Sequence, residues 1–193
     1  FRRFNPGCVV VLHVSRLFAD FDAERFGKTP GVFINPERRM TALGKGLMHA
    51  HVSNFRHLCA TDAPFDTFCI ASSNEMFVRP GLAVYAGRTL NGFQAVPFRP
   101  SLDWHVIYRR VNRLPQMSAL LALLGTDAAY GGQTEGQFYQ RKVFERIADA
   151  YDKAFGTADI NEFETEEVVP QTVAMALGVT PAMPFTLADY AYN

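Results

Sequence analysis

Short apolar runs alternate with amphipathic segments through the first half of the sequence. The runs at residues 9–14, 31–35 and 65–71 are each bounded by proline, glycine or polar residues, which is typical of strands, and the first is apolar enough to be buried on both faces. A short helix is predicted at residues 21–26. Before the third run, residues recur at the spacing of one helical face. This face consists of Leu47, Ala50, His51, Asn54, Phe55 and Leu58. The alternation predicts an α/β fold with a mostly parallel, twisted sheet flanked by helices.

The second half of the sequence predicts three more helices and one less regular stretch. A helix at residues 115–124 has proline in its first turn and glycine after its last. Two further helices are predicted at residues 144–155 and 172–177, each followed by glycine. Residues 82–100 are rich in glycine and aromatic side chains and predict a short hairpin. Because no repeat, low-complexity segment or linker interrupts the chain, residues 1–193 are expected to form a single domain.

The composition argues against several classes of protein. The chain has 19 basic and 19 acidic residues and no basic stripe, which argues against non-specific binding to nucleic acid. No apolar run reaches the roughly 18 residues that a membrane span needs, and 17 Phe and 7 Tyr exclude a disordered chain. Three cysteines without a CxxC pair argue against a disulfide framework or a zinc site, so Cys8 and Cys69 are expected to be buried free thiols.

Chemistry is expected beyond the carboxyl ends of the strands, where ligands bind in open α/β sheets. The first segment in this position is residues 13–15, His-Val-Ser, and the second is residues 72–75, Ser-Ser-Asn-Glu. The second is more prominent, because four polar residues interrupt an apolar context. A polar turn with capping side chains is the alternative interpretation.

Two later segments also carry groups suited to chemistry. Residues 164–167 form an acidic cluster before the last helix, where carboxylates either interact with the helix dipole or supply a general base. Residues 131–136, Gly-Gly-Gln-Thr-Glu-Gly, are neither a Walker loop nor a GxGxxG motif. They are typical of a turn, although their glycines also permit close approach of the backbone to a ligand.

No metal site is expected. Asp20 and Asp22 match the DxD pattern of metal-dependent glycosyltransferases, but a three-residue match has a high chance frequency. His49 and His51 are two residues apart, so on a helix they point in different directions.

The order of these segments resembles that of the core-2/I-branching glycosyltransferase family, which includes β-1,6-N-acetylglucosaminyltransferases and peptide xylosyltransferases. Where the family has a strand ending in His-Val-Asp, residues 13–15 are His-Val-Ser. Residues 43–46, Leu-Gly-Lys-Gly, stand in place of a Trp-Gly-Gly-like turn. Residues 71–80 match the polar classes of the family's Leu-Ser-Gly-Gln-Asp-Phe-Pro-Leu-Lys-Thr.

The resemblance continues to roughly residue 177. Residues 131–133, Gly-Gly-Gln, are similar to the family's Gly-Ser-Gln. Glu166 and Glu167 stand in place of its Asp-Glu, and Thr172 follows Glu167 at the family's spacing of five. Each segment matches the family by the chemical class of its residues more than by their identity. The resemblance is therefore specific only through the order and spacing of all the segments together.

The resemblance implies a GT-A-like fold and inverting transfer of a GlcNAc- or xylose-type sugar from a UDP-sugar to a glycan hydroxyl. Glu167, with Glu166 beside it, would be the catalytic base. The residues expected at the donor are His13, Ser15, Ser73, Asn74, Glu75 and Arg79, and those expected at the acceptor are Gln133, Glu135 and Trp104. The family needs no metal ion, so no cofactor is expected and basic side chains would stabilise the departing diphosphate. Core packing is the alternative role for Trp104.

The sequence departs from the family in several places. Ser15 replaces the family's aspartate, and Pro170 leaves open a helix start that puts Glu167 in a loop. Lys153 is the only basic residue after Arg146. The residues then expected to hold the diphosphate are Arg79, Arg109, Arg110 or Lys45. The chain is expected to lack the family's first strand–helix unit and the C-terminal end of its catalytic domain.

Two other functions stay open. A non-catalytic binding or structural subunit with a glycosyltransferase fold is favoured by Ser15 and by the missing basic residues. An unrelated α/β nucleotide-binding or hydrolytic enzyme is the third possibility. The expected partners are a nucleotide-sugar and a glycan, with no nucleic acid and no membrane span. The sequence leaves the compartment open; few cysteines favour a cytoplasmic, bacterial-type enzyme over the disulfide-rich Golgi members.

Overall fold

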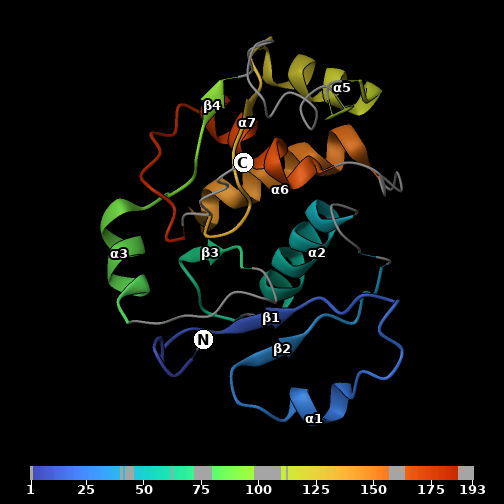
Figure 1. The fold of residues 1–193 in the computed structure, drawn as a ribbon, viewed down its shortest axis with the longest axis vertical. Helices are drawn as coiled ribbons and strands as arrows, with labels where there is room; N and C mark the ends of the chain where they lie inside the picture. The colour runs from blue at the N-terminus through green and yellow to red at the C-terminus, as the bar shows by residue number, and fades with distance from the viewer. Residues whose placement is uncertain are drawn as a thin grey trace, which may run out of the picture.

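The computed structural model describes residues 2–39, 41, 46–61, 63–71, 80–97, 110–111, 113–156 and 164–186. In chain order, the described elements are β1 (Val10–Leu12), α1 (Ala23–Gly27), β2 (Val32–Ile34), α2 (Leu47–Ala60), β3 (Thr67–Cys69), α3 (Leu82–Thr89), β4 (Val96–Pro97), α5 (Pro115–Leu124), β5 (Tyr130–Gly131), β6 (Phe138–Gln140), α6 (Arg141–Phe155), the 3-10 helix η1 (Thr165–Glu167) and α7 (Val169–Ala176). Figure 1 shows β1, α1 and β2 at one end of the molecule and α5 at the other.

The first three elements form a parallel βαβ unit. β1 and β2 pair in parallel, and α1 connects them. The helix begins after Asp22, whose carboxylate caps it by accepting a hydrogen bond from the Arg25 N–H at 2.9 Å. This confirms both predicted strands and the short helix, although the strands are half-buried, not buried on both faces. Because the strands are parallel, residues 13–15 and 35–37 both follow strand ends at one edge.

The other described strands pair antiparallel. β3 pairs with β6, with Phe68 opposite Tyr139, and β4 pairs with β5. The described residues therefore form a mixed α/β fold with three two-stranded sheets in place of one mostly parallel sheet. The alternation pattern predicted neither β5 nor β6, because both strands lie in or beside the glycine-rich segment at residues 131–136.

The hairpin predicted at residues 82–100 is wrong over residues 82–89, which form α3. Leu82 and Ala86 lie one helical turn apart and are both buried, so the helix has an apolar stripe against the rest of the molecule. The glycine content had suggested a turn. Gly87, however, is exposed with nothing within 4 Å of a Cβ position, where glycine costs a helix only about 1 kcal/mol.

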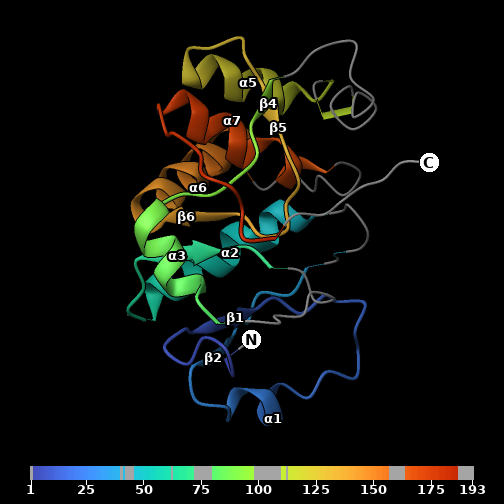
Figure 2. The same ribbon diagram turned by 60° about the vertical axis from the view of Figure 1, so that its left-hand side comes forward.

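The hydrophobic core lies between α2, α6 and the β3–β6 pair. Phe144 on α6 is fully buried, and its ring centroid lies 4.4 Å from Phe68 on β3, 5.0 Å from Phe55 on α2 and 5.8 Å from Tyr139 on β6. α5 and α7 pack against α6, and Figures 1 and 2 both show α6 between α2 and α5. The helices predicted for these segments are confirmed. α5 has the predicted bounds and ends at Gly125, whose φ of 65° favours glycine.

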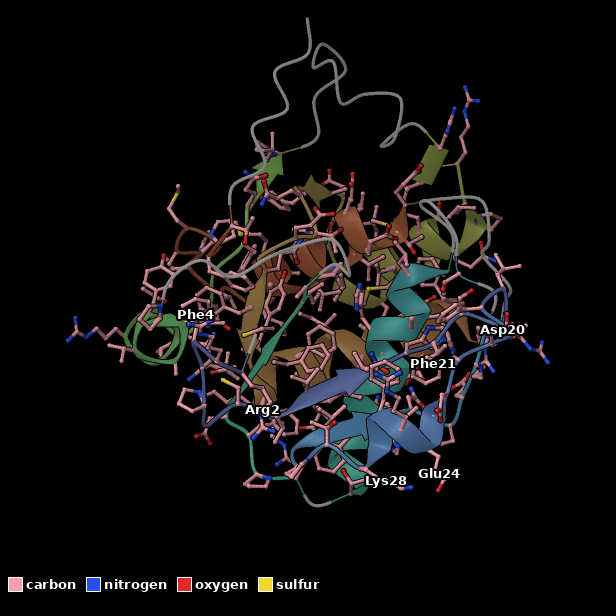
Figure 3. The ribbon with its side chains drawn as sticks, turned by 60° about the horizontal axis from the view of Figure 1, so that its bottom comes forward. Arg2, Phe4, Asp20, Phe21, Glu24 and Lys28 are labelled. Carbon is pink, nitrogen blue, oxygen red and sulfur yellow. The ribbon has the colours of Figure 1, made fainter. Side chains whose placement is uncertain are left out.

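The DxD match has a structural explanation. Asp22 caps α1, and both Asp20 and Asp22 are exposed. Figure 3 shows Asp20 at the edge of the molecule, with Glu24 and Lys28 on α1, where they form an ion pair at 2.8 Å. None of the helices in the described ranges is long and apolar enough to cross a lipid bilayer.

All three cysteines are free thiols, which confirms the prediction for Cys8 and Cys69, although each is half-buried and not fully buried. Burial raises the pKa of the Cys8 thiol and raises that of Cys69 to about 12. Because the thiolate is the reactive form, neither thiol is suited to act as a nucleophile at neutral pH.

Candidate functional site

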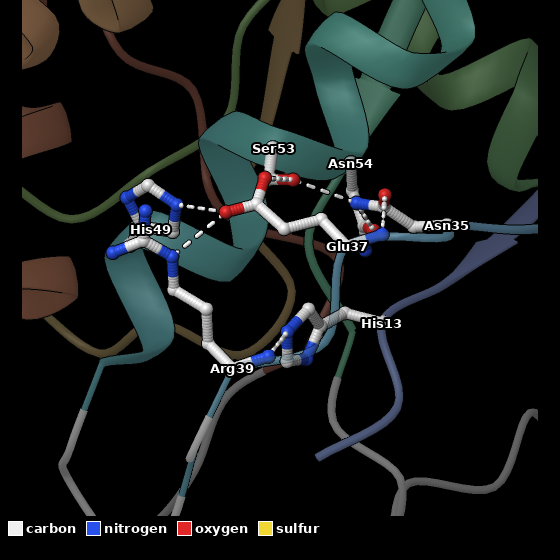
Figure 4. Close-up of polar contacts among 7 residues, drawn as sticks. All are labelled: His13, Asn35, Glu37, Arg39, His49, Ser53 and Asn54. Carbon is white, nitrogen blue, oxygen red and sulfur yellow. Dashed lines mark hydrogen bonds and ion pairs between the residues drawn. The ribbon is translucent and has the colours of Figure 1, made fainter. Parts of the chain in front are cut away.

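Seven polar residues gather where β1 and β2 end and α2 begins (Figure 4). We call them the strand-edge cluster: His13, Asn35, Glu37, Arg39, His49, Ser53 and Asn54. They come from the segment after β1, the segment after β2 and α2. The parallel pairing explains why they meet, because it brings both strand ends to one edge of the βαβ unit.

Glu37 is the centre of the strand-edge cluster. Its Oε2 accepts a hydrogen bond from Ser53 Oγ at 2.5 Å, and its Oε1 accepts one from Arg39 Nε at 2.7 Å and lies 3.0 Å from His49 Nε2. Burial by itself raises the pKa of Glu37, but the hydrogen bonds from Ser53, Arg39 and His49 outweigh it and lower the pKa to about 2. Glu37 is therefore ionised at neutral pH and holds Arg39 and His49 in place.

Asn35 fastens the end of β2 to α2. Its side chain is buried, and Nδ2 donates to Ser53 Oγ at 2.8 Å and to Asn54 Oδ1 at 3.0 Å. Its Oδ1 accepts from the Glu37 N–H at 3.0 Å. The sequence patterns did not single out Asn35 or Glu37. Their position directly after a strand was the available signal, since the same position drew attention to residues 13–15.

His13 and Ser15, both predicted at the donor, lie at this edge and are hydrogen-bonded within the protein. His13 Nε2 accepts the Arg39 N–H at 3.1 Å. Burial lowers the pKa of His13, as do His49 and the nearby arginines, while Glu37 raises it; the net shift is downward. Ser15 Oγ donates to Thr41 O at 2.9 Å and accepts the Thr41 N–H at 3.1 Å. The Ser15 hydroxyl therefore joins two strand-end segments.

A second polar group forms where the loop at residues 131–136 packs against the start of α7. The Gly132 N–H donates to Glu167 O at 3.0 Å, and Gln171 Nε2 donates to Gly132 O at 3.1 Å. Thr172 Oγ accepts from the Tyr130 N–H at 2.9 Å and donates to Tyr130 O at 3.1 Å. These contacts bring together four predicted site residues: Gln133, Glu135, Glu166 and Glu167.

The carboxylates here form the glutamate cluster: Glu135, Glu164, Glu166 and Glu167. Each has a buried Oε2 without a hydrogen-bond partner among the described residues. Burial, with the charges of the neighbouring glutamates, raises the pKa of Glu166 to about 8 and that of Glu167 to about 7. Glu166 is 3% exposed, whereas Glu167 is only half-buried. Both glutamates lie in η1, before α7. α7 begins at Val169, beside Pro170, which is the helix start that the sequence had left open.

The glycines of the loop serve packing within the protein. A Cβ on Gly132 would lie 2.6 Å from Gln94 Cβ, and one on Gly136 would lie 2.5 Å from Thr186 N. The Gln133 amide is also hydrogen-bonded within the chain, because its Nε2 donates to Glu135 O at 2.8 Å and to Thr186 O at 2.5 Å. The close approach that the glycines permit is therefore occupied by the chain itself.

Tyr151 on α6 links the strand-edge cluster to the glutamate cluster. Burial raises the pKa of Tyr151 well above its usual value; the Arg39 charge lowers it, and the charges of Asp152 and Glu166 raise it. Arg39 and Glu166 therefore both lie within electrostatic range of this side chain. The His49 ring is 6.4 Å from the Tyr151 ring, and η1 packs near α2. The two clusters are thus neighbours, one positively charged at its edge and one acidic.

Most of the other predicted site residues lie outside the described residues. These are Lys45, Ser73, Asn74, Glu75, Arg79, Trp104 and Arg109. Arg110, also suggested for the diphosphate, is described and exposed. Among the described residues, no group of three or more His, Cys, Asp or Glu is arranged to hold a metal ion. Two surface hollows, about 310 Å³ beside α5 and about 550 Å³ beside α3 and α6, include no residue of either cluster. The two clusters form the candidate site, because they hold the ionisable groups with shifted pKa values that acid–base catalysis and ligand binding require.

Comparison with known proteins leaves the family open. No protein-family model matches the sequence, and no curated protein matches it.

Replacing Glu166 by glutamine is expected to stabilise the protein in alkaline solution. The folded pKa of about 8 lies above the value of about 4.3 in an unfolded chain, so the folded state loses stability as the pH rises from about 5 through 8. Glu166→Gln removes this loss, and the melting temperature should rise by about 10 °C or more at pH 9 and change little at pH 5. Glu145→Gln, at an exposed position on α6, is the control. An equal change at both pH values would contradict the raised pKa.

Proposed function

We propose that the protein is an inverting glycosyltransferase that moves a GlcNAc- or xylose-type sugar from a UDP-sugar to a glycan hydroxyl. The observation that carries this proposal is the packing of the loop at residues 131–136 against Glu166 and Glu167, with the pKa of Glu167 at about 7. A carboxylate with this pKa is about half ionised at neutral pH and accepts a proton more strongly than an ordinary glutamate. A GT-A-like fold belongs to the same proposal.

Exposure distinguishes the roles of the two glutamates. Glu167 is half-buried and is therefore more accessible to an acceptor hydroxyl than Glu166, which is 3% exposed. With a pKa of about 8, Glu166 is mainly protonated at neutral pH and adds little negative charge beside the base. We therefore assign Glu167 as the base, with Glu166 as its protonated neighbour.

The proposed reaction is a single displacement. Glu167 takes the proton of the acceptor hydroxyl as that oxygen attacks the anomeric carbon. The new carbon–oxygen bond forms on the face opposite the bond to the diphosphate, which breaks and releases UDP. The configuration at the anomeric carbon is therefore inverted. The donor would lie toward the strand-edge cluster and the acceptor toward Glu135 and Gln133. The reaction consumes the UDP-sugar as co-substrate and uses no cofactor or metal.

Release of UDP tests the proposal. The full chain is incubated with UDP-GlcNAc or UDP-xylose and a mixture of oligosaccharide acceptors, with manganese or with EDTA, and UDP is measured enzymatically. UDP release that depends on acceptor and persists in EDTA is the expected result. Release that occurs only with manganese would contradict metal-independent transfer.

A non-catalytic binding subunit is the second candidate. It is favoured by the hydrogen bonds of Ser15 and Gln133, whose side chains are both engaged within the protein. Nucleotide-sugar binding without UDP release for any acceptor would support this function.

A further inference from the structure

Arg39 lies at the strand edge with hydrogen-bond donors that no described residue uses. Its Nε is paired with Glu37, and its two Nη atoms have no hydrogen-bond partner among the described residues. The side chain is 31% exposed. The backbone is fixed on both sides, because the Arg39 N–H donates to His13 Nε2 at 3.1 Å and its carbonyl accepts from the Arg16 N–H at 2.9 Å. The guanidinium is therefore held in place, and its outer edge is open to a ligand.

The His49 ring stands next to this guanidinium. Its Nε2 lies 3.0 Å from the Glu37 carboxylate, and no described residue bonds its Nδ1. In the protonated imidazole both ring nitrogens donate, so His49 can bridge Glu37 and an anionic oxygen. Figure 4 shows the His49 ring and the Arg39 guanidinium side by side, both attached to the same oxygen of Glu37.

The charges around these two groups favour an anion. Arg38 lies at the same edge, where its guanidinium donates to the carbonyls of Val14 and Ser15. Glu37 already receives hydrogen bonds from Ser53 and Arg39 and contacts His49, so its charge is compensated. The first turn of α2 contains no acidic residue.

We infer that Arg39 and His49 bind a phosphate group of the protein's ligand. A guanidinium fork matches two phosphate oxygens, and a neighbouring imidazole N–H matches a third. The ligand's identity rests on the proposed function, in which the diphosphate of the UDP-sugar leaves with a negative charge. Neither residue is among those that the sequence suggested for the diphosphate. Together they would supply the positive charge that the sequence lacks after Lys153, where no further basic residue occurs.

Calorimetric titration tests this site without any transfer reaction. The full chain is titrated with inorganic pyrophosphate, UDP, uridine and glucose 6-phosphate. Pyrophosphate and UDP should bind, and uridine should bind much more weakly. Arg39→Gln should weaken pyrophosphate binding at least about tenfold, because it removes charge-assisted hydrogen bonds. Arg88→Gln removes the same charge from an exposed position on α3 and should have no effect. Melting temperatures check that Arg39→Gln still folds, as the retained backbone hydrogen bonds imply.

The outcomes separate this site from the proposed transfer. Equal pyrophosphate affinity in Arg39→Gln and the parent chain, or no pyrophosphate binding, overturns the phosphate site even if UDP is released in the transfer assay. Arg39-dependent pyrophosphate binding without transfer supports the phosphate site and contradicts the enzyme. Arg39-dependent binding of glucose 6-phosphate but not UDP supports the site and overturns the diphosphate as its occupant.

Discussion

Replacing Glu167 by glutamine is expected to lower kcat for sugar transfer by about 10²–10⁴-fold, the usual loss when a general base is removed. Glutamine keeps the shape of the side chain but cannot accept the acceptor's proton. The backbone carbonyl that receives the Gly132 N–H remains, so the loop at residues 131–136 should stay docked. UDP release at saturating donor and acceptor gives kcat, and calorimetry with UDP gives the donor affinity, which should be unchanged.

The same assay carries its own control and pH test. Glu145→Gln, on the exposed side of α6, should retain full activity. In the parent chain the rate should rise with pH through about 7, because burial and the neighbouring glutamates raise the pKa of Glu167 to that value and only the ionised form is a base. Full activity in Glu167→Gln would remove Glu167 from the mechanism.

Replacing Phe144 by alanine is expected to cost about 3–5 kcal/mol of unfolding free energy. The ring is fully buried and contacts aromatic rings from α2, β3 and β6, so its loss leaves a cavity at the point where these elements meet. Urea denaturation measures the change. Phe18→Ala, at a side chain that is 56% exposed, should change the free energy by less than about 0.5 kcal/mol. A loss below 1 kcal/mol for Phe144→Ala would mean that the core lies elsewhere.

Local sequence signals predicted the helices better than they predicted the sheets. α2 and α6 have apolar residues at helical spacing, and α5 lies between Pro115 and Gly125, so short-range patterns fix all three. β6 is three residues long and buried, and its partner β3 lies about seventy residues away in the sequence. A pattern of neighbouring residues cannot predict that β3 and β6 pair with each other. α3 was missed because its glycine content outweighed the helical spacing of Leu82 and Ala86.

The candidate site shows the same division between local and distant information. Glu166 and Glu167 were found because they form an acidic run before a helix, and Glu135 because its loop is rich in glycine. Of the strand-edge cluster, only His13 was predicted as a site residue. Glu37 was not found, because its significance comes from Ser53, Arg39 and His49, three partners that only the folded chain assembles around it. Raised pKa values depend on burial and likewise cannot be predicted from sequence spacing.

Nucleotide-sugar binding is the most direct test of the central proposal, because it needs no acceptor. Melting temperatures of the full chain are measured with UDP, UDP-GlcNAc, UDP-xylose, UDP-glucose and GDP-mannose, each in EDTA and in manganese. A ligand at about 100 times its dissociation constant adds roughly 2.7 kcal/mol, which is about 5–10 °C for a chain of this size. We expect such a shift with UDP and at least one UDP-sugar, unchanged by EDTA. No shift with any of these nucleotides would contradict a UDP-sugar site in this chain.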